Sequence, residues 1–379
     1  MQRWKSPFSL AGLISVPEAS EALIHLSGLT KEQLVELVGS WGEKPYRAKQ
    51  LWAWLHVRLA PDVDAMTDLS LAFRDRLKSL CASLRPEIAR HQQAADGTEK
   101  WLMTLADGQT IETVLIPEEG RGTLCISSQA GCSLNCPFCH TGTQGLARNL
   151  TTAEIVNQIL LVRGELLRRQ DEPQRVTNIV LMGMGEPLYN YQAVAQAVQI
   201  MLDGNGLAFG SRKITLSTAG VVPRLAQAGR ELGVNLAISL HAARDELRDQ
   251  LVPLNRKYNL AALKQALQSY PLKQGRRITW EYVLLDGVND SDDDARQVAR
   301  YLSDLPSKVN LIPFNPWPGA LFAPSTPQRV ERFQQLLHQS GYVTVIRDRR
   351  GADIEAACGQ LTGLLQGSRA RPVTGIAAA

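Results

Sequence analysis

The sequence predicts an α/β protein organised around a parallel, right-handed β/α sheet. Between about residues 119 and 345, six apolar strand-like segments alternate with stretches of helical periodicity. Such alternation is typical of a parallel sheet, either a barrel or a doubly wound fold. A helical stretch over residues 21–90 and an alternating pattern over 101–117 come before it. The 379 residues therefore suffice for about two to three domains.

The composition is that of an ordinary globular protein. Hydrophobic residues make up 44% and charged residues 21%, which excludes a disordered chain, a collagen and a small disulfide scaffold. The net charge of +4 is too small to indicate nucleic acid by itself. No apolar run reaches the roughly 18 residues that a membrane helix needs, and residues 1–20, a separate N-terminal extension, lack a signal-peptide core. We expect a cytoplasmic protein without a membrane partner.

Residues 21–90 are expected to form a helical accessory domain. Thr30 and Gln33 match a capping box, and helical patterns cover 46–59 and 66–84. Basic and aromatic residues are interleaved in this domain, which suits an RNA-binding surface but equally suits a core stripe beside solvated charges. They are Lys44, Tyr46, Arg47, Lys49, Trp52, Trp54 and His56.

Residues 91–118 are expected to form a β-hairpin linker. Apolar residues alternate on both sides of Asp107-Gly108, which is a strong hairpin signal. Glu112 lies on the same strand face as Val114 and Ile116. Apolar neighbours would raise the pKa of this carboxyl, although an exposed strand face explains the pattern equally well.

The β/α region follows, and helix caps separate its strands. Thr151 and Glu154 form a second capping box, and a last helix is expected from Thr326-Pro327 to Gly341. Residues 363–379 are small and polar, so we expect a disordered tail. The six expected strands are 123–128, 178–183, 213–218, 234–240, 277–285 and 309–314.

Three cysteines follow the first of these strands: Cys132, Cys136 and Cys139. A loop with this spacing can hold three irons of a 4Fe-4S cluster and leave the fourth iron open for the methionine part of S-adenosylmethionine (SAM). Zinc bound by the three thiolates and His140 is the alternative, but adjacent Cys139 and His140 share one tetrahedral ion poorly. The spacing, with an aromatic residue before the last cysteine, resembles the radical SAM signature.

Candidate ligands for SAM stand at the ends of the later strands. In a β/α barrel these ends form the active face, so the groups are expected to converge above the cysteine loop. Each alone is as consistent with a turn or a helix cap. The candidates are Gly185, Glu186, Ser217, Ser239, Leu240, His241 and Asn315.

The segments 121–150, 183–187, 216–220, 239–241, 313–316 and 351–361 resemble the RlmN family of radical SAM methyltransferases, and the likeness extends over about residues 20–362. These enzymes methylate adenine of 23S rRNA and of tRNA. The resemblance implies a partial (β/α)6 TIM-type radical SAM barrel over 119–362, ending in a methyl-carrier loop. It also implies a 4Fe-4S cluster, two SAM molecules per turnover, an electron donor such as flavodoxin or ferredoxin, and a monomer. His140 departs from the small residue expected there.

The resemblance assigns three further residues. Cys358 would receive a methyl group from the first SAM, and a radical made from the second SAM would activate this group for addition to C2 of adenine. Glu112 would remove the C2 proton. Cys125 would form a disulfide with Cys358 and so release the methylated RNA. The alternative for both thiols is an ordinary buried cysteine, as expected for Cys81.

Two other functions remain open from the sequence. The related Cfr-type enzymes methylate C8 of the ribosomal adenine, and the Gln144-Gly145 element favours C2 over this. A non-catalytic iron–sulfur or zinc RNA-binding module would need neither Glu112 nor Cys358.

Overall fold

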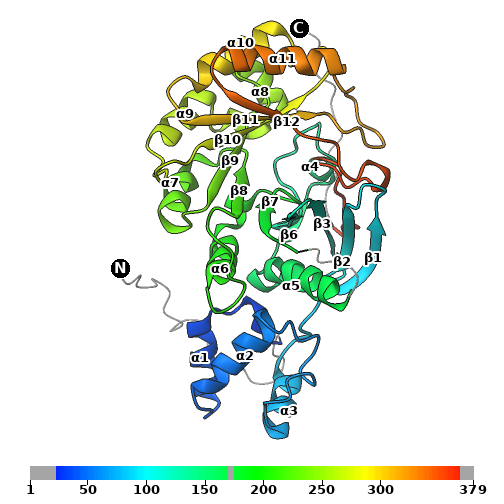
Figure 1. Ribbon diagram of the computed structural model, residues 1–379, viewed down its shortest axis with the longest axis vertical. Helices are drawn as coiled ribbons and strands as arrows, with labels where there is room; N and C mark the ends of the chain where they lie inside the picture. Colours follow the sequence, from blue (N-terminus) through cyan, green and yellow to red (C-terminus); the bar gives the residue numbers. More distant parts are fainter. Residues whose placement is uncertain (1–22, 170–174, 368–379) are drawn as a thin grey trace.

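The computed structural model describes residues 23–169 and 175–367, so the expected N-terminal extension lies outside the described residues. A small helical region forms one end of the molecule, and a long sheet with helices packed against it forms the rest (Figure 1). No helix in the described ranges is long and apolar enough to cross a membrane.

The helical region contains η1 (Leu26–Gly28), α1 (Lys31–Ser40), α2 (Tyr46–His56) and α3 (Leu71–Leu80). The Thr30–Gln33 capping box is confirmed, because each side chain bonds the other residue's backbone N–H. Helix α3 is shorter than the expected 66–84 because Ser70 caps it, accepting from the Phe73 N–H. Leu34, Leu51 and Leu77 are buried between these helices.

One continuous sheet contains ten of the strands in the described residues, in the order β1-β2-β3-β4-β7-β8-β9-β10-β11-β12. The first four are antiparallel, and β4 begins a parallel series that runs to β12. The sheet has two edges and is not closed. The strands are β1 (Glu87–Gln93), β2 (Glu99–Thr104), β3 (Thr110–Glu118), β4 (Arg121–Cys125), β7 (Asn178–Leu181), β8 (Ile214–Thr218), β9 (Asn235–Ser239), β10 (Ile278–Leu284), β11 (Ser307–Pro313) and β12 (Val343–Ile346).

The six expected parallel strands are all present, within a few residues of their expected ends. The parallel series has one more strand, β12, which pairs with β11 and forms the far edge. Strand β1 also differs from expectation, because part of it falls in the region assigned to the helical domain. Both additional strands are edge strands.

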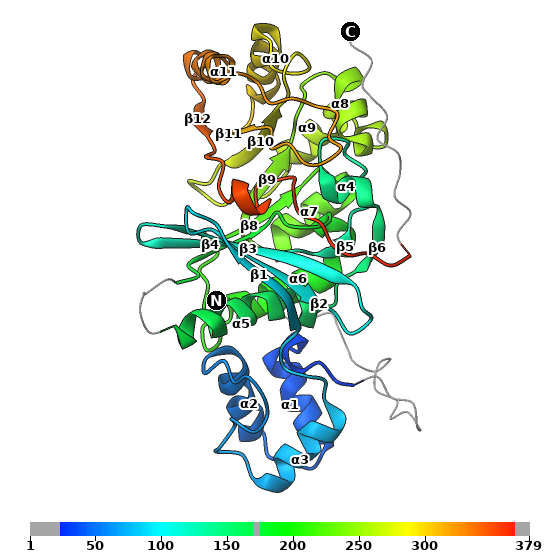
Figure 2. The same ribbon diagram turned by 90° about the vertical axis from the view of Figure 1, so that its right-hand side faces the viewer.

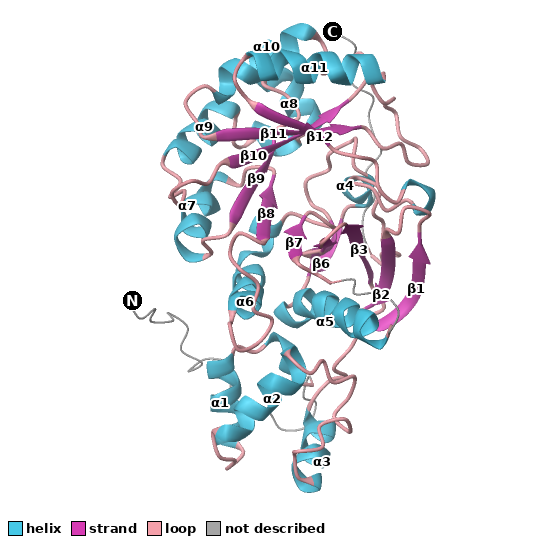
Figure 3. Cartoon of the chain, viewed as in Figure 1, coloured by secondary structure: helices cyan, strands magenta, loops and turns pink. Residues whose placement is uncertain are grey.

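Helices connect the parallel strands and pack on the outer face of the sheet (Figure 3). The Thr151–Glu154 capping box and the Thr326 cap are confirmed at the starts of the helices they precede. These connections place the carboxyl ends of the strands at one edge, where the cysteine loop lies. The helices are α5 (Thr152–Arg168), α6 (Tyr191–Leu202), α7 (Val222–Glu231), α8 (Asp245–Leu251), α9 (Leu260–Gln268), α10 (Asp292–Leu302) and α11 (Pro327–Gln339).

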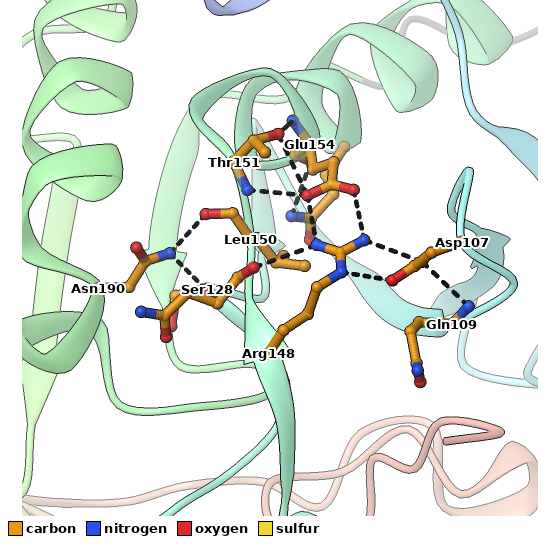
Figure 4. A network of polar contacts seen from close by, with 10 residues as sticks. Asp107, Gln109, Ser128, Arg148, Leu150, Thr151, Glu154 and Asn190 are labelled. Carbon is orange, nitrogen blue, oxygen red and sulfur yellow. Dashed lines mark hydrogen bonds and ion pairs between the residues drawn. The ribbon is translucent and has the colours of Figure 1, made fainter. Parts of the chain in front are cut away.

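Arg148 fixes the hairpin of β2 and β3 to the core (Figure 4). This residue lies on β6 (Leu146–Asn149), which pairs with β5 (Gln129–Gly131). Its Nε and Nη2 bond Asp107 at 2.6 and 3.0 Å, and Nη1 and Nη2 bond the Glu154 carboxylate at 2.8 Å each. One guanidinium thus joins the hairpin tip to the first turn of α5.

A C-terminal strap, residues 359–366, crosses the molecule beside α4 (His140–Gln144) and β3 (Figure 2). Thr141 Oγ1 donates to Leu361 O at 2.6 Å, and Gln144 Nε2 donates to Gly363 O at 2.9 Å. Gln366 O accepts from Gln109 Nε2 at 2.9 Å. The start of the expected disordered tail is therefore held by hydrogen bonds, and residues 368–379 lie outside the described residues.

Candidate active site

A cavity opens at the carboxyl ends of the parallel strands. Most of the sequence-predicted site residues line it, and they come from the cysteine loop, from β7, β8 and β9, and from the segment after β12. The predicted residues in its wall are Cys132, Cys136, Cys139, Gly185, Glu186, Ser217, Ser239, His241 and Cys358. The other four, Glu112, Cys125, Leu240 and Asn315, are not part of this lining.

The cysteine loop presents its three thiols to one cavity. Cys132 is buried, Cys136 and Cys139 are half-buried, and none of the three is in a disulfide. Burial raises the pKa of the Cys132 thiol to about 12, and burial also raises the pKa of Cys136 and of Cys139. Thiols in such a place become thiolates when a bound cation compensates the charge.

The three loop thiols all line the same cavity, so they can bind one shared inorganic group. His140, the suggested fourth zinc ligand, stacks on Trp317 with ring centroids 4.5 Å apart. Three thiolates around a shared space can hold a cubane with one open iron.

Gly185 and Glu186 follow β7 and form the next part of the wall. Gly185 has a φ of +99°, and a Cβ there would lie 2.5 Å from Gln129 Cβ, so only glycine fits. Glu186 accepts from the backbone N–H groups of Ala219 at 2.8 Å and Leu188 at 3.0 Å. Burial nevertheless raises the pKa of the Glu186 carboxyl to about 7. A ligand ammonium at this position would stabilise the carboxylate.

Gln129 positions Glu186 from behind. Its Oε1 accepts from the Glu186 N–H at 2.9 Å, and its Nε2 donates to Asn149 Oδ1 at 2.7 Å. Asn149 is next to Arg148 in the sequence, so the cavity wall is connected to the arginine that holds the β2–β3 hairpin on α5.

The ends of β8 and β9 meet around a buried arginine that the sequence analysis did not identify. Arg248 on α8 is fully buried and donates to Leu240 O at 3.0 Å, Ala219 O at 2.8 Å and Ser239 O at 3.0 Å. Its fourth bond is to Asn255 Oδ1 at 2.8 Å. Burial lowers the pKa of Arg248 to about 10, which leaves the guanidinium charged at neutral pH.

Leu240 lies behind the wall, because its side chain is buried in the core and its carbonyl accepts from Arg248. His241, with a φ of +59°, packs edge-on against Phe138 with ring centroids 4.7 Å apart. Its Nδ1 accepts from the Val283 N–H at 3.0 Å. Burial, assisted by Arg248, lowers the pKa of His241 to about 3, so the ring is neutral.

Cys358 faces the cavity from the segment before the strap. Asn315 Nδ2 donates to Cys358 O at 3.1 Å, so Asn315 holds the backbone of this cysteine. Arg347 Nη1 lies 3.7 Å from Cys358 Sγ. Burial first, and then the nearby Cys358, raise the pKa of the Cys125 thiol to about 12. Cys125 is thus a buried neighbour of Cys358, and both thiols are free.

Glu112 is buried, so the exposed-face alternative is wrong. Its Oε1 pairs with Lys100 Nζ at 2.9 Å, and its Oε2 accepts from the Thr362 N–H of the strap at 2.7 Å. Burial raises the pKa of the Glu112 carboxyl, and Lys100 opposes that rise. The strap thus bonds α4 on one side and this carboxylate on the other.

The interleaved residues of the helical region divide into two groups. Trp52 and His56 are buried, so they belong to the core of the helical region and not to an RNA-binding surface. Trp54 donates to Asp68 Oδ1 at 2.6 Å, with Arg58 above its ring, whereas Tyr46 is exposed. Arg347, which follows β12, lines the cavity described above.

Three residues with structural roles at the site were not identified from the sequence: Lys100, Gln129 and Arg248. The partners of each come from other elements of the fold, so local spacing does not identify them. The one indication in the sequence was Lys100, a charged residue in an alternating strand pattern. In the structure it lies directly opposite Val114 and near Glu112.

Comparison with known proteins gives consistent matches. Residues 126–299 match the model of the radical SAM superfamily, and residues 24–82 match that of the ribosomal RNA large subunit methyltransferase N-terminal domain. The dual-specificity RNA methyltransferase RlmN of Magnetococcus marinus is 65% identical over 351 residues, covering 92% of this chain and 98% of that protein. That of Rhodospirillum rubrum is 53% identical over 352 residues, covering 92% and 82%.

A solved structure also matches. The crystal structure of a radical SAM methyltransferase from Sphaerobacter thermophilus superposes with a TM-score of 0.85 at 45% sequence identity. The match covers 89% of this chain and 98% of that one, so it includes the helical region, the hairpin and the parallel strands together.

Proposed function

The chain belongs to the RlmN family of dual-specificity RNA methyltransferases, and on this premise we propose that it methylates C2 of adenine in 23S rRNA and in tRNA by radical SAM chemistry. One observation supports the proposed roles of individual residues. Cys358 opens into the same cavity as Cys132, Cys136 and Cys139. The proposed reaction needs a thiol outside the cysteine loop to carry the methyl group, and Cys358 supplies it. The relatives bear the RlmN name, which favours C2 over the Cfr-type C8 position.

The proposed cofactors are a 4Fe-4S cluster held by Cys132, Cys136 and Cys139, and SAM bound against the strand ends. When bound, the cluster would supply the electron that cleaves SAM reductively. Glu186 accepts from the SAM ammonium, and Gly185 allows the backbone to approach it. Ser217, Ser239 and His241 complete the wall, and Leu240, between two of them, is proposed to contact SAM through its backbone. Asn315 holds Cys358 and has a buried Oδ1 without a partner in the described residues.

Two SAM molecules are proposed for each turnover, because Cys358 first needs a methyl group of its own. The Cys358 thiolate displaces this group from the sulfonium, and S-adenosylhomocysteine leaves. The C2 carbon of adenine is electron-poor, so only a carbon radical, and no simple methyl transfer, can form the new bond there. In the proposed reaction this radical forms on the methyl group that Cys358 carries. Its addition to C2 therefore joins Cys358 covalently to the RNA.

Glu112 and Cys125 are proposed to resolve this adduct. Glu112 takes the C2 proton, for which a desolvated carboxylate is a stronger base than one in water. The one electron left by the radical addition would return to the cluster when it is bound. Attack by the Cys125 thiolate on the Cys358 sulfur then breaks the bond between that sulfur and the methylene carbon and forms a disulfide between the two cysteines. The methylene carbon keeps the bonding electrons and takes a proton, which makes it the new methyl group. The neighbouring positions of the two cysteines beside Arg347 support the disulfide step.

The remaining proposals concern partners and domains. Residues 21–90 bind RNA, 91–118 link them to the core, and 119–362 carry the chemistry and the methyl carrier. The adenine enters the cavity by leaving its stack, as in other base-modifying enzymes. The protein works as a monomer in the cytoplasm with an electron donor such as flavodoxin or ferredoxin.

The test is a combined analysis of anaerobically purified protein and its product. We expect about four irons with matching sulfide per chain, and 2-methyladenine in digested 23S rRNA and tRNA by mass spectrometry. Replacing any one of the three loop cysteines with Ala should remove both the iron and SAM cleavage. One zinc without sulfide, or 8-methyladenine as the product, would overturn the proposal.

A further inference from the structure

Two groups of opposite charge face the cavity beside Cys358, and the proposed chemistry gives neither a role. Glu281, on β10, is 4% exposed and lies in the cavity wall. Its Oε1 accepts from Asn310 Nδ2 at 2.9 Å. Its Oε2 is buried and accepts no hydrogen bond from the described residues. The guanidinium of Arg347 lies 3.7 Å from this oxygen, measured from Nε.

Arg347 places its donors between Glu281 and the methyl-carrying thiol. While Nε faces Glu281, Nη1 lies 3.7 Å from Cys358 Sγ and Nη2 lies 3.9 Å from Met182 Sδ. Sulfur is a weak acceptor, so these contacts leave much of the donor capacity of the guanidinium unused. Cys358, Arg347 and Glu281 thus follow one another in this order along the cavity.

The wall around this row is apolar. In the β10–β11 pairing, Glu281 is opposite Asn310, and Val283 is opposite Ile312. Side chains two residues apart share one face of a strand, so Val283 and Ile312 lie beside the Glu281–Asn310 pair. Met182 from the end of β7 lines the same cavity. A base placed here has apolar groups against its faces and charged groups at its edge.

We propose that Glu281 and Arg347 read the Watson–Crick edge of the target adenine, with Glu281 accepting from the N6 amino group and Arg347 donating to N1. This inference rests on the proposed function. Around the adenine ring the order is C2, N1 and then C6 with its amino group. Along the cavity the order is Cys358, Arg347 and Glu281, so a base with C2 at Cys358 has N1 and N6 beside matching partners.

The same pair discriminates against guanine. Guanine carries an O6 acceptor and an N1–H donor, the reverse of the adenine pattern. Its O6 would face the Glu281 carboxylate, and its N1–H would face the Arg347 guanidinium. A site built from buried hydrogen-bonding groups rejects such a ligand strongly, because its own groups are left unpaired.

The experiment compares bases at the target position of an RNA substrate: adenosine, purine riboside, which lacks the amino group, and inosine, which carries O6 and N1–H. Methylation kcat/KM is measured for the wild type, for Glu281→Gln and for a control, Glu99→Gln. Glu99 is fully buried and pairs with Arg169 at 2.8 Å, but it lies outside the cavity wall. The control therefore removes a buried carboxylate charge without touching the base.

The wild type should prefer adenosine to purine riboside by about tenfold to a hundredfold, the effect of one hydrogen bond to a charged group. In Glu281→Gln this ratio should fall towards one, and inosine should gain relative to adenosine, because the Gln amide can donate to O6. Glu99→Gln should keep the wild-type ratio even if its total activity falls.

Equal losses on adenosine and purine riboside in Glu281→Gln would mean that Glu281 only anchors Arg347, and the inference would be wrong. If that variant does not fold, the wild-type series decides alone, since equal rates on adenosine and purine riboside overturn it. Failure of the proposed function looks different, because the wild type would then leave adenosine unmethylated or methylate another atom.

Discussion

Lys100 Nζ lies 2.9 Å from Glu112 Oε1, and both side chains are buried. The ammonium also donates to Glu355 O at 3.2 Å, three residues before Cys358. One lysine thus holds both the proposed base and the backbone that leads to the methyl carrier. Because burial raises the pKa of Glu112 and Lys100 opposes this, the pair sets the pH at which the base is ionised.

Lys100→Met should move the pH profile of methylation to higher pH. Without the ammonium the pKa of Glu112 rises further, and each unit of rise costs about tenfold in carboxylate at a pH below it. Activity should therefore fall at neutral pH and recover as the pH rises. Single-turnover methylation rates across the pH range measure this, with Lys100→Arg as the charge-preserving control. An equal loss at every pH would mean that Lys100 only stabilises the fold.

Cys358→Ala and Cys125→Ala should fail at different steps. Cys358→Ala has no sulfur to carry the methyl group, so it should yield neither methylated protein nor methylated RNA. Cys125→Ala should load Cys358 and add to adenine, and then stall with protein bound to RNA. A denaturing gel should show a shifted, nuclease-sensitive band for Cys125→Ala only, and not for the double variant. Normal turnover of Cys125→Ala would make Cys125 a structural thiol.

Glu186 should make the stability of the cluster-free, SAM-free protein depend on pH. Its pKa is about 7 when the protein is folded, against 4.5 for an ordinary glutamate, so the folded state binds the proton more tightly. The stabilisation by this proton is complete below pH 4.5 and is lost as the pH rises through 7, a change of roughly 3 kcal/mol. Urea unfolding at several pH values should show this decline, and Glu186→Gln should flatten it. Identical slopes for the two proteins would contradict the prediction.

Arg248→Met should destabilise the fold by about 3–5 kcal/mol, the usual cost of breaking a buried polar network by removing one partner. It leaves the backbone carbonyls of Ala219, Ser239 and Leu240 without their donor. Arg248→Lys keeps the charge but not the fork of donors, so it should recover only part of the loss. Denaturant midpoints measure both. SAM binding should weaken in parallel, and unchanged affinity in the destabilised variant would separate the network from the SAM site.

Local signals in the sequence predicted much of this molecule correctly. Thr30, Thr151 and Thr326 cap helices through bonds that span three residues, so the pattern is visible in a short window. The β/α alternation also predicted the six central strands, because buried parallel strands are long apolar runs. Spacing alone also predicted that the three loop cysteines act together, and all three line one cavity, while their role as cluster ligands stays a proposal.

The missed features depend on contacts between distant segments. Strand β12 is a short edge strand with one buried residue among four. Its pattern is therefore a weak signal for a strand. The end of the strap falls in the expected disordered tail because no helical or strand pattern covers it, yet its backbone groups bond α4 and β3. Arg248 could not be identified from the sequence because three of its four acceptors are backbone carbonyls, which every residue possesses. Glu112 was placed on the right face, but only the fold reveals its lysine.

The strap also determines when the enzyme becomes complete during its synthesis. Leu361 and Gly363 bond residues made about 220 positions earlier, Thr141 and Gln144, and Thr362 bonds Glu112, 250 positions earlier. Domains fold from the N-terminus as the ribosome releases them, so the cysteine loop and the hairpin emerge long before their C-terminal partners. A nascent or truncated chain can therefore contain all three loop cysteines and still lack the methyl carrier. On the proposed mechanism, the covalent chemistry on RNA begins only after the strap has docked.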